Sequence, residues 1–87
     1  MKDNKSLSRF ELEVDNQIVF ADYHILENVL YIDYVEAPVE LRGSGAAGKL
    51  MEEISQMALT KKLKIVPICG YAALWLRRHK QYHDLLN

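Results

Sequence analysis

The 87-residue chain contains little cysteine, no long apolar segment and almost no net charge. Its one cysteine, Cys69, cannot form a disulfide within the chain, and its three histidines are too scattered to complete a zinc site. The longest nearly apolar segment, residues 65–75, is interrupted by Pro67 and Gly70 and is far shorter than the roughly 20 residues of a membrane span. Residues 1–6 are polar and resemble no signal peptide. These absences predict a cytoplasmic protein with no metal and no membrane partner.

The length predicts one small domain, which we expect to span residues 1–87, with residues 1–6 as a loose terminus. The net charge of −1 hides an asymmetry, because residues 1–41 hold three Lys or Arg against nine Asp or Glu, and residues 42–87 hold eight against three. This division suits a phosphate-rich ligand beside a cationic acceptor and is equally compatible with two solvated surfaces. The basic residues are not interleaved with aromatic ones, so no nucleic acid partner is expected.

Glycine is also scarce, but three of the four glycines lie within six residues, at positions 43, 45 and 48. Glycines that open into a helix let several backbone N–H groups approach one point, which favours a phosphate. Residues 43–48 match the GxGxxG motif of dinucleotide-binding folds. That motif requires a strand directly before it and an acidic residue about 20 positions later, and both are missing. Residues 43–49 match the GxxxxGK part of the P-loop motif, but the Ser or Thr that must follow is replaced by Leu50. Neither nucleotide motif therefore fits its surroundings.

The first part of the chain alternates apolar and polar residues with the period of two that is typical of strands. This pattern predicts strands over residues 7–14, 17–25 and 29–35, joined by tight turns into an antiparallel meander. The third strand is nearly continuously apolar, so we expect it to be central and covered on both faces.

The second part changes to helical spacing. Residues 44–61 carry one apolar stripe and predict a helix packed on the sheet. Residues 64–68 predict a short strand, which a crossover connection would place parallel to its neighbour. A second helix is expected from near Tyr71 to at least His79, continuing or restarting through Leu86. The fold class is therefore α/β (α+β), with a mixed sheet in which a three-stranded antiparallel meander precedes helix, parallel strand and helix.

Three segments of this chain carry a family resemblance. Arg42-x-x-Gly45-x-Ala47 resembles the pyrophosphate-binding motif of the GCN5-related N-acetyltransferases. The chain is similar, more narrowly, to the small bacterial GNAT-like predicted acetyltransferases, whose r-G-x-G-x-a, v-P-x-C and h-x-x-Y patterns appear at residues 42–47, 66–69 and 79–82. The resemblance spans residues 8–86. It implies a compact GNAT fold and an acetyl-CoA-dependent N-acetyltransferase that acts on an amine of a small molecule or a protein.

The chain departs from the family at two places. Tyr34-Val35 stands where the family often has a His-Thr pair, and the two helices that usually form a wall of the acceptor site are missing. An alternative function is therefore a non-catalytic acyl-CoA-binding or protein-interaction module with the same fold. Nucleotide binding is the third alternative. We expect a monomer or a homodimer.

The resemblance, together with the chemistry of helix N-termini, indicates a cosubstrate site for acetyl-CoA. The loop and first helical turn would hold the phosphates, and the end of the third strand would pair with the pantetheine arm. The residues concerned are Tyr34, Val35, Glu36, Arg42, Gly43, Ser44, Gly45, Ala46, Ala47 and Lys49.

Four residues are candidates for acid, base or nucleophilic catalysis. Cys69 lies where a strand ends and a helix begins, where a thiol is a stronger nucleophile, and it would accept the acetyl group or protonate the leaving thiolate. Glu36 is the candidate general base, and His79 and Tyr71 are candidate acids. Cys69, Glu36 and His79 each have a plain alternative as a packing or solvated side chain.

Overall fold

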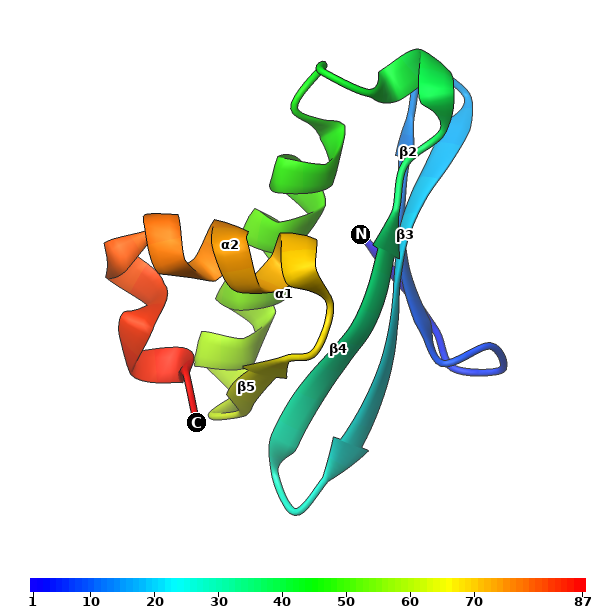
Figure 1. The fold of residues 1–87 in the computed structure, drawn as a ribbon. Coiled ribbons are helices and arrows are strands. Elements are labelled where there is room, and N and C mark those ends of the chain that lie inside the picture. Colours follow the sequence, from blue (N-terminus) through cyan, green and yellow to red (C-terminus); the bar gives the residue numbers. More distant parts are fainter.

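The computed structural model describes residues 1–87 as one five-stranded sheet with its helices on one face (Figure 1). The strands are β1 (Lys2–Asn4), β2 (Arg9–Val14), β3 (Gln17–Leu26), β4 (Val29–Glu36) and β5 (Lys64–Pro67). The α-helices are α1 (Ala46–Lys61) and α2 (Gly70–Arg78), and two 3-10 helices are η1 (Val39–Leu41) and η2 (Lys80–Leu85). The spatial order of the strands follows the chain, and only β4 and β5 are parallel. The predicted fold class is confirmed.

Two tight turns produce the antiparallel meander of β2, β3 and β4. Asp15 and Asn16 both have positive φ, at 51° and 63°, and Glu27 and Asn28 have 50° and 65°. Asn and Asp, which fill three of these four positions, tolerate this left-handed region, and two consecutive positive φ values give a hairpin turn whose twist matches that of its strands. The sequence therefore sets the register of both hairpins.

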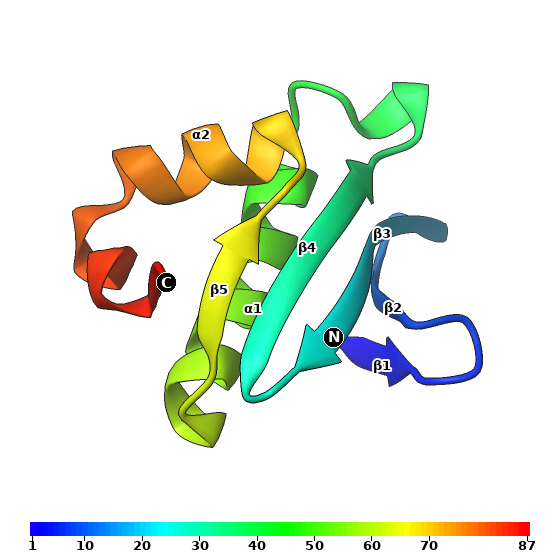
Figure 2. The same cartoon turned by 60° about the horizontal axis from the view of Figure 1, so that its bottom comes forward.

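The strand pairing on both sides of β4 changes at the middle of this strand. The pairing partner in β3 shifts between Asp22 and Tyr23, so Asp33 has no residue opposite it and forms a β-bulge. On the other side, the parallel pairing with β5 stops at Ile32. β4 then continues to Glu36 without a neighbouring strand on that side (Figure 2). This free end of β4 forms one wall of the site described below.

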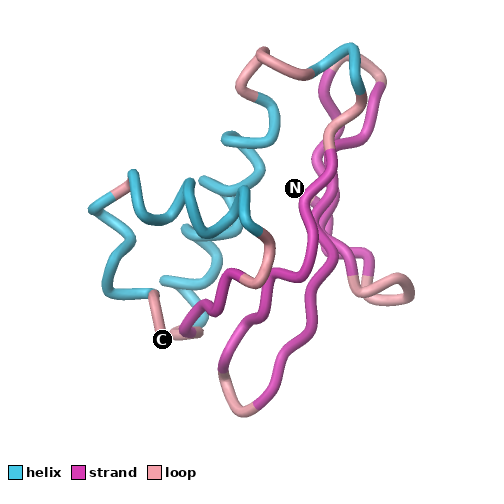
Figure 3. The backbone as a smooth tube through the Cα atoms, in the orientation of Figure 1, coloured by secondary structure: helices cyan, strands magenta, loops and turns pink.

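The molecule has two layers, one of strands and one of helices (Figure 3). Its hydrophobic core lies between them. The largest fully buried apolar side chains are Phe10, Leu30, Ile32, Leu50, Met51, Ile54, Ile65, Leu76 and Val19.

The expectation that the third strand is covered on both faces is wrong. Leu30 and Ile32 of β4 are fully buried against the helices, whereas Tyr31 is only half-buried and Tyr34 is exposed. No helix packs on their side of the sheet (Figures 1 and 2). The apolar run of β4 therefore contains aromatic residues that face solvent.

The N-terminal residues correct another expectation. Residues 2–4 are not loose but form β1, which pairs with β2 in an antiparallel register. Asp3 accepts a hydrogen bond of 2.5 Å from the Tyr23 hydroxyl on β3. This bond connects β1 across β2 to the middle of the sheet, and it requires no apolar side chain from residues 1–6.

Hydrogen bonds between η2 and α1 hold the helical layer together. The Tyr82 hydroxyl of η2 donates to Glu52 and accepts a 2.6 Å hydrogen bond from the Gln56 side chain, both on α1. Ser55, fully buried on α1, has a hydroxyl with no hydrogen-bond partner. The second predicted helix ends at Arg78 and restarts as η2. None of the helices combines the length and the apolar character needed to span a membrane.

Candidate functional site

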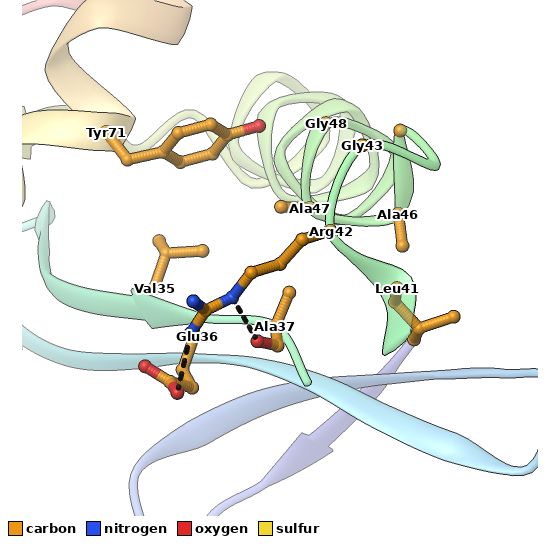
Figure 4. Close-up of a pocket in the computed structure, with 11 residues that line it drawn as sticks. Val35, Glu36, Ala37, Leu41, Arg42, Gly43, Ala46, Ala47, Gly48 and Tyr71 are labelled. Carbon is orange, nitrogen blue, oxygen red and sulfur yellow. Dashed lines mark hydrogen bonds and ion pairs between the residues drawn. The ribbon is translucent and has the colours of Figure 1, made fainter. Parts of the chain in front are cut away.

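A cavity of about 480 Å³ lies between the free end of β4 and the N-terminus of α1 (Figure 4). The first residues of α2 close its third side through Tyr71. Its lining comes from the end of β4, the glycine-rich loop and the first turn of α1. The lining residues are Val35, Glu36, Ala37, Leu41, Arg42, Gly43, Gly45, Ala46, Ala47, Gly48 and Tyr71.

The loop before α1 takes a conformation that depends on two glycines. Gly43 and Gly45 have φ values of +82° and +86°, which side-chain-bearing residues adopt only at a cost. Between them, the Ser44 hydroxyl donates to the Leu41 carbonyl at 2.5 Å and accepts the Ala46 N–H at 3.3 Å. Ser44 thus fixes the loop from within and satisfies the first helical N–H group. α1 begins at Ala46 rather than at the predicted residue 44 because Gly45 is left-handed.

The remaining N–H groups at this helix start have no acceptor within the chain. The first α-helical bond runs from Lys49 N–H to the Gly45 carbonyl, at 2.9 Å. The N–H groups of Gly43, Gly45, Ala47 and Gly48 form no hydrogen bond, and all four residues line the cavity. Unpaired N–H groups and the positive end of the helix dipole together favour an anion at this point.

Arg42 crosses the mouth of the cavity from the loop to the end of β4 (Figure 4). Its Nε donates to the Ala37 carbonyl at 3.4 Å, and its Nη2 lies 3.8 Å from Glu36 Oε2. Glu36 also accepts a hydrogen bond from the Tyr34 hydroxyl. The only cationic side chain of the lining is therefore paired with a solvent-exposed carboxylate, which an anionic ligand can replace.

Tyr71 reaches over the first turn of α1 (Figure 4). A methyl group added at Gly48 would lie 3.7 Å from the Tyr71 hydroxyl and 3.3 Å from Trp75 Nε1, so the glycine permits this close approach. Burial, and then the charge of Cys69, raise the pKa of Tyr71 above its ordinary value of 10.0. The phenol is therefore protonated at neutral pH and is a hydrogen-bond donor on the cavity wall.

Cys69 is the residue that immediately precedes α2. Its N–H and that of Ile68 both donate to the Ile32 carbonyl, each at 3.0 Å, where β5 leaves the sheet. The thiol is free and half-buried. Tyr71 follows Cys69 by two residues, at the start of α2. Cys69 is beside the cavity but not among its lining residues.

The structure brings most, but not all, of the predicted site residues together. Lys49 is exposed one turn into α1 and does not line the cavity. Tyr34 lies on the opposite face of β4 and contacts the site through Glu36. His79 lies at the far end of α2, where its ring stacks on Trp75 and its Nδ1 is 2.7 Å from the Trp75 carbonyl.

Three lining residues were missing from the prediction, namely Ala37, Leu41 and Gly48. Gly48 could have been found, because it is the third member of the glycine cluster and lies on the same helical turn as Ala47. Ala37 and Leu41 carry no chemical signal, since they contribute only backbone and apolar surface.

Two comparisons with known proteins identify the family and the fold. The family described as GCN5-related N-acetyl-transferase matches residues 9–85. The solution NMR structure of a GCN5-like candidate N-acetyltransferase from Staphylococcus aureus has a similar fold, with a TM-score of 0.64 and 20% identity, covering 90% of this chain and 87% of that chain. At this identity the likeness shows the fold alone. Among curated proteins, none matches this chain. By the family match over most of its length, the chain belongs to the GCN5-related N-acetyltransferases.

Proposed function

We propose that the protein transfers an acetyl group from acetyl-CoA to a primary amine. The observation that carries this proposal is that four residues with unpaired N–H groups line one cavity beside the free end of β4. A diphosphate fits this arrangement, because its oxygens accept several hydrogen bonds and its charge complements the helix dipole. Family membership makes the diphosphate of acetyl-CoA the first candidate.

The rest of the cosubstrate follows from the walls of the cavity. Arg42 would exchange Glu36 for a phosphate oxygen and make a charge-assisted contact. The pantetheine arm would lie along β4 beyond Ile32, where the strand has no neighbour and its backbone can pair with amide groups. A cosubstrate bound in this way would direct its thioester toward Cys69 and Tyr71 at the start of α2.

We propose that Cys69 accepts the acetyl group first. Its thiolate attacks the thioester carbonyl, the bond from that carbon to the CoA sulfur breaks, and the CoA thiolate takes up the proton that the Cys69 thiol lost. A neutral amine then attacks the acetyl-cysteine and the new C–N bond forms. The bond from the carbonyl carbon to the Cys69 sulfur breaks, and the cysteine thiolate takes up the proton that the nitrogen, positively charged after the attack, releases. Tyr71 would donate a hydrogen bond to a developing negative charge. Glu36 remains the candidate base.

Thermal unfolding in the presence of ligands tests the cosubstrate. Acetyl-CoA and CoA should raise the melting temperature because they bind only the folded chain, whereas NAD and Mg-ATP should leave it unchanged. Stabilisation by Mg-ATP without CoA would contradict the proposal and favour nucleotide binding. Release of free CoA thiol on addition of amines would then separate an enzyme from a module that only binds.

Cys69→Ala tests the chemistry separately. Acetyl transfer should be lost while the thermal shift with acetyl-CoA is retained, and acid quenching should trap an acetyl group on the wild-type cysteine only. Wild-type turnover in this variant would end the role of Cys69 as nucleophile. Binding of acetyl-CoA without any turnover in the wild type would favour the second candidate, a non-catalytic module, which the uncovered face of the sheet also suits.

A further inference from the structure

The closing h-x-x-Y pattern places His79 and Tyr82 against one side chain of α2, that of Trp75. The His79 ring stacks on the indole, with 3.7 Å between ring centroids and 12° between ring planes. The Tyr82 ring lies 5.8 Å from the indole at an angle of 21°. We call Trp75, His79 and Tyr82 the aromatic cluster. None of the three residues lines the cavity, so the cluster can affect the site only at its edge.

Hydrogen bonds fix both neighbours of the indole. His79 Nδ1 lies 2.7 Å from the Trp75 carbonyl, and the backbone N–H of His79 donates to the same carbonyl at 3.1 Å. The Tyr82 hydroxyl donates to Glu52 and accepts from Gln56, both on α1. Trp75 is only 8% exposed, and close-packed rings of this kind leave a side chain little freedom to turn. The aromatic cluster therefore holds the indole in one orientation.

This orientation places the edge of the indole against the first turn of α1. A methyl group added at Gly48 would lie 3.3 Å from Trp75 Nε1 and 3.7 Å from the Tyr71 hydroxyl. Gly48 and Tyr71 both line the cavity, and the Tyr71 hydroxyl points toward this turn (Figure 4). The indole N–H consequently lies at the edge of the cavity, beside Gly48.

The Trp75 N–H is a donor that finds no acceptor within the chain. Neither the hydrogen bonds of His79 and Tyr82 nor any other includes Trp75 Nε1. Ser55 carries the only fully buried polar side-chain atom without a partner, so Trp75 Nε1 keeps contact with solvent. An indole N–H can only donate, and the neighbouring N–H of Gly48 is unpaired as well. A ligand at this point must therefore supply an oxygen that accepts hydrogen bonds.

The position of the indole indicates which oxygen this is. The diphosphate of the proposed cosubstrate would lie at the glycine-rich loop, and its thioester near Cys69 at the start of α2. Gly48 is the last lining residue on α1, and Tyr71 is the lining residue of α2. The point where they meet lies between the two ends of the cosubstrate, where the pantetheine arm would run. The amide carbonyls of that arm are acceptors of the kind that the indole N–H lacks.

We propose that Trp75 Nε1–H donates a hydrogen bond to an amide carbonyl of the pantetheine arm, and that His79 and Tyr82 are positioning residues that hold the indole for this contact. This inference rests on the proposed acetyltransferase function and specifies its cosubstrate site. In this role His79 contacts no substrate and transfers no proton.

Isothermal titration with two ligands tests the contact. Trp75→Phe keeps an aromatic ring but removes the N–H, and it should weaken CoA binding about fivefold, the loss of one neutral hydrogen bond. Phosphoadenosine diphosphate, which is CoA without its pantetheine arm, should bind this variant as tightly as the wild type. Partial unfolding would weaken both ligands, so it cannot produce a loss that is confined to CoA.

Fluorescence of Trp75, the only tryptophan of the chain, tests the positioning residues and needs no variant of the indole. CoA should shift the wild-type emission, and phosphoadenosine diphosphate should not. In the free protein, His79→Ala should move the emission to longer wavelengths because water replaces the stacked ring, and it should weaken CoA binding about threefold. His79→Phe supplies a ring that can stack and should restore both properties. His83→Ala is the matched control, since His83 is exposed on η2 and contacts the Arg77 carbonyl.

Equal losses of both ligands in Trp75→Phe, or no loss of CoA affinity, would overturn the contact. An emission shift in His79→Ala without weaker CoA binding, or the same weakening in His83→Ala, would overturn the positioning role. Failure of the proposed function has a different sign, because the wild type itself would then show no thermal shift with CoA.

Discussion

Replacing Arg42 with alanine should weaken CoA binding about tenfold and leave the stability of the fold almost unchanged. In the free protein the guanidinium lies 3.8 Å from Glu36, and the two side chains are 63% and 37% exposed. An ion pair in such contact with solvent contributes at most about 1 kcal/mol, and commonly much less. Its removal should therefore change the free energy of unfolding by no more than about 0.5 kcal/mol.

The bound state differs, because Arg42 would then face a diphosphate that the helix N-terminus already holds in place. A hydrogen bond to a charged group contributes roughly 1.5–3 kcal/mol, and 1.4 kcal/mol corresponds to a factor of ten in Kd. Solvent exposure places Arg42 at the lower end of this range. Glu36→Gln should act in the opposite direction, because it removes the carboxylate that competes for Arg42, and should tighten CoA binding about twofold.

Isothermal titration with CoA measures both changes, and urea unfolding checks the stability of each variant. Arg78→Ala is the matched control, since Arg78 is exposed at the end of α2 with no ionic partner. The reasoning fails if Arg42→Ala binds CoA as tightly as the wild type, or if Arg78→Ala loses as much affinity. It also fails if Glu36→Gln binds CoA more weakly.

Three further predictions concern the stability of the fold. Gly45→Ala should lower the free energy of unfolding by about 1 kcal/mol, because Gly45 has a φ of +86°, although the added methyl group would touch nothing. Gly70 is not left-handed, so Gly70→Ala should not destabilise the fold. Equal effects of the two substitutions in urea unfolding would contradict this. Ser55→Ala should raise the melting temperature, because a buried hydroxyl without a partner costs about 1 kcal/mol or more, and a lower melting temperature would imply a partner for that hydroxyl. Burial, and then the hydrogen bond to Asp3, raise the pKa of Tyr23 from 10.0 to about 12, so its stabilising contribution is complete below pH 10 and is lost as the pH rises toward 12. Tyr23→Phe should flatten this alkaline loss in unfolding experiments, and an unchanged pH profile would refute the assignment.

The regular elements could be predicted from the sequence because each has its own local signal. The alternation in residues 9–14 and the paired turn residues at 15–16 and 27–28 predict the meander without knowledge of the rest of the chain. The apolar stripe of α1 is an equally clear local signal for a helix. β1 was missed because it has no apolar alternation and is stabilised by pairing with β2 and by the bond to Tyr23.

The exposed side of β4 could not be predicted either. A run of apolar and aromatic residues is the usual pattern of a strand buried on both faces, but the bulge at Asp33 places Tyr34 on the open side. The glycine-rich loop before α1 was predictable because its conformation depends on backbone and glycine. The hydrogen bond from the Cys69 N–H to the Ile32 carbonyl was not, since it depends on where β5 leaves the sheet.

The double hydrogen bond at the Ile32 carbonyl has a consequence for binding kinetics. Because the N–H groups of Ile68 and Cys69 share this single acceptor, the chain after β5 diverges from β4 without any ligand. The cosubstrate would enter a gap that already exists, and little conformational entropy would be lost on its arrival. Association should accordingly follow a single exponential whose rate rises linearly with ligand concentration, without the plateau that a slow opening step would impose.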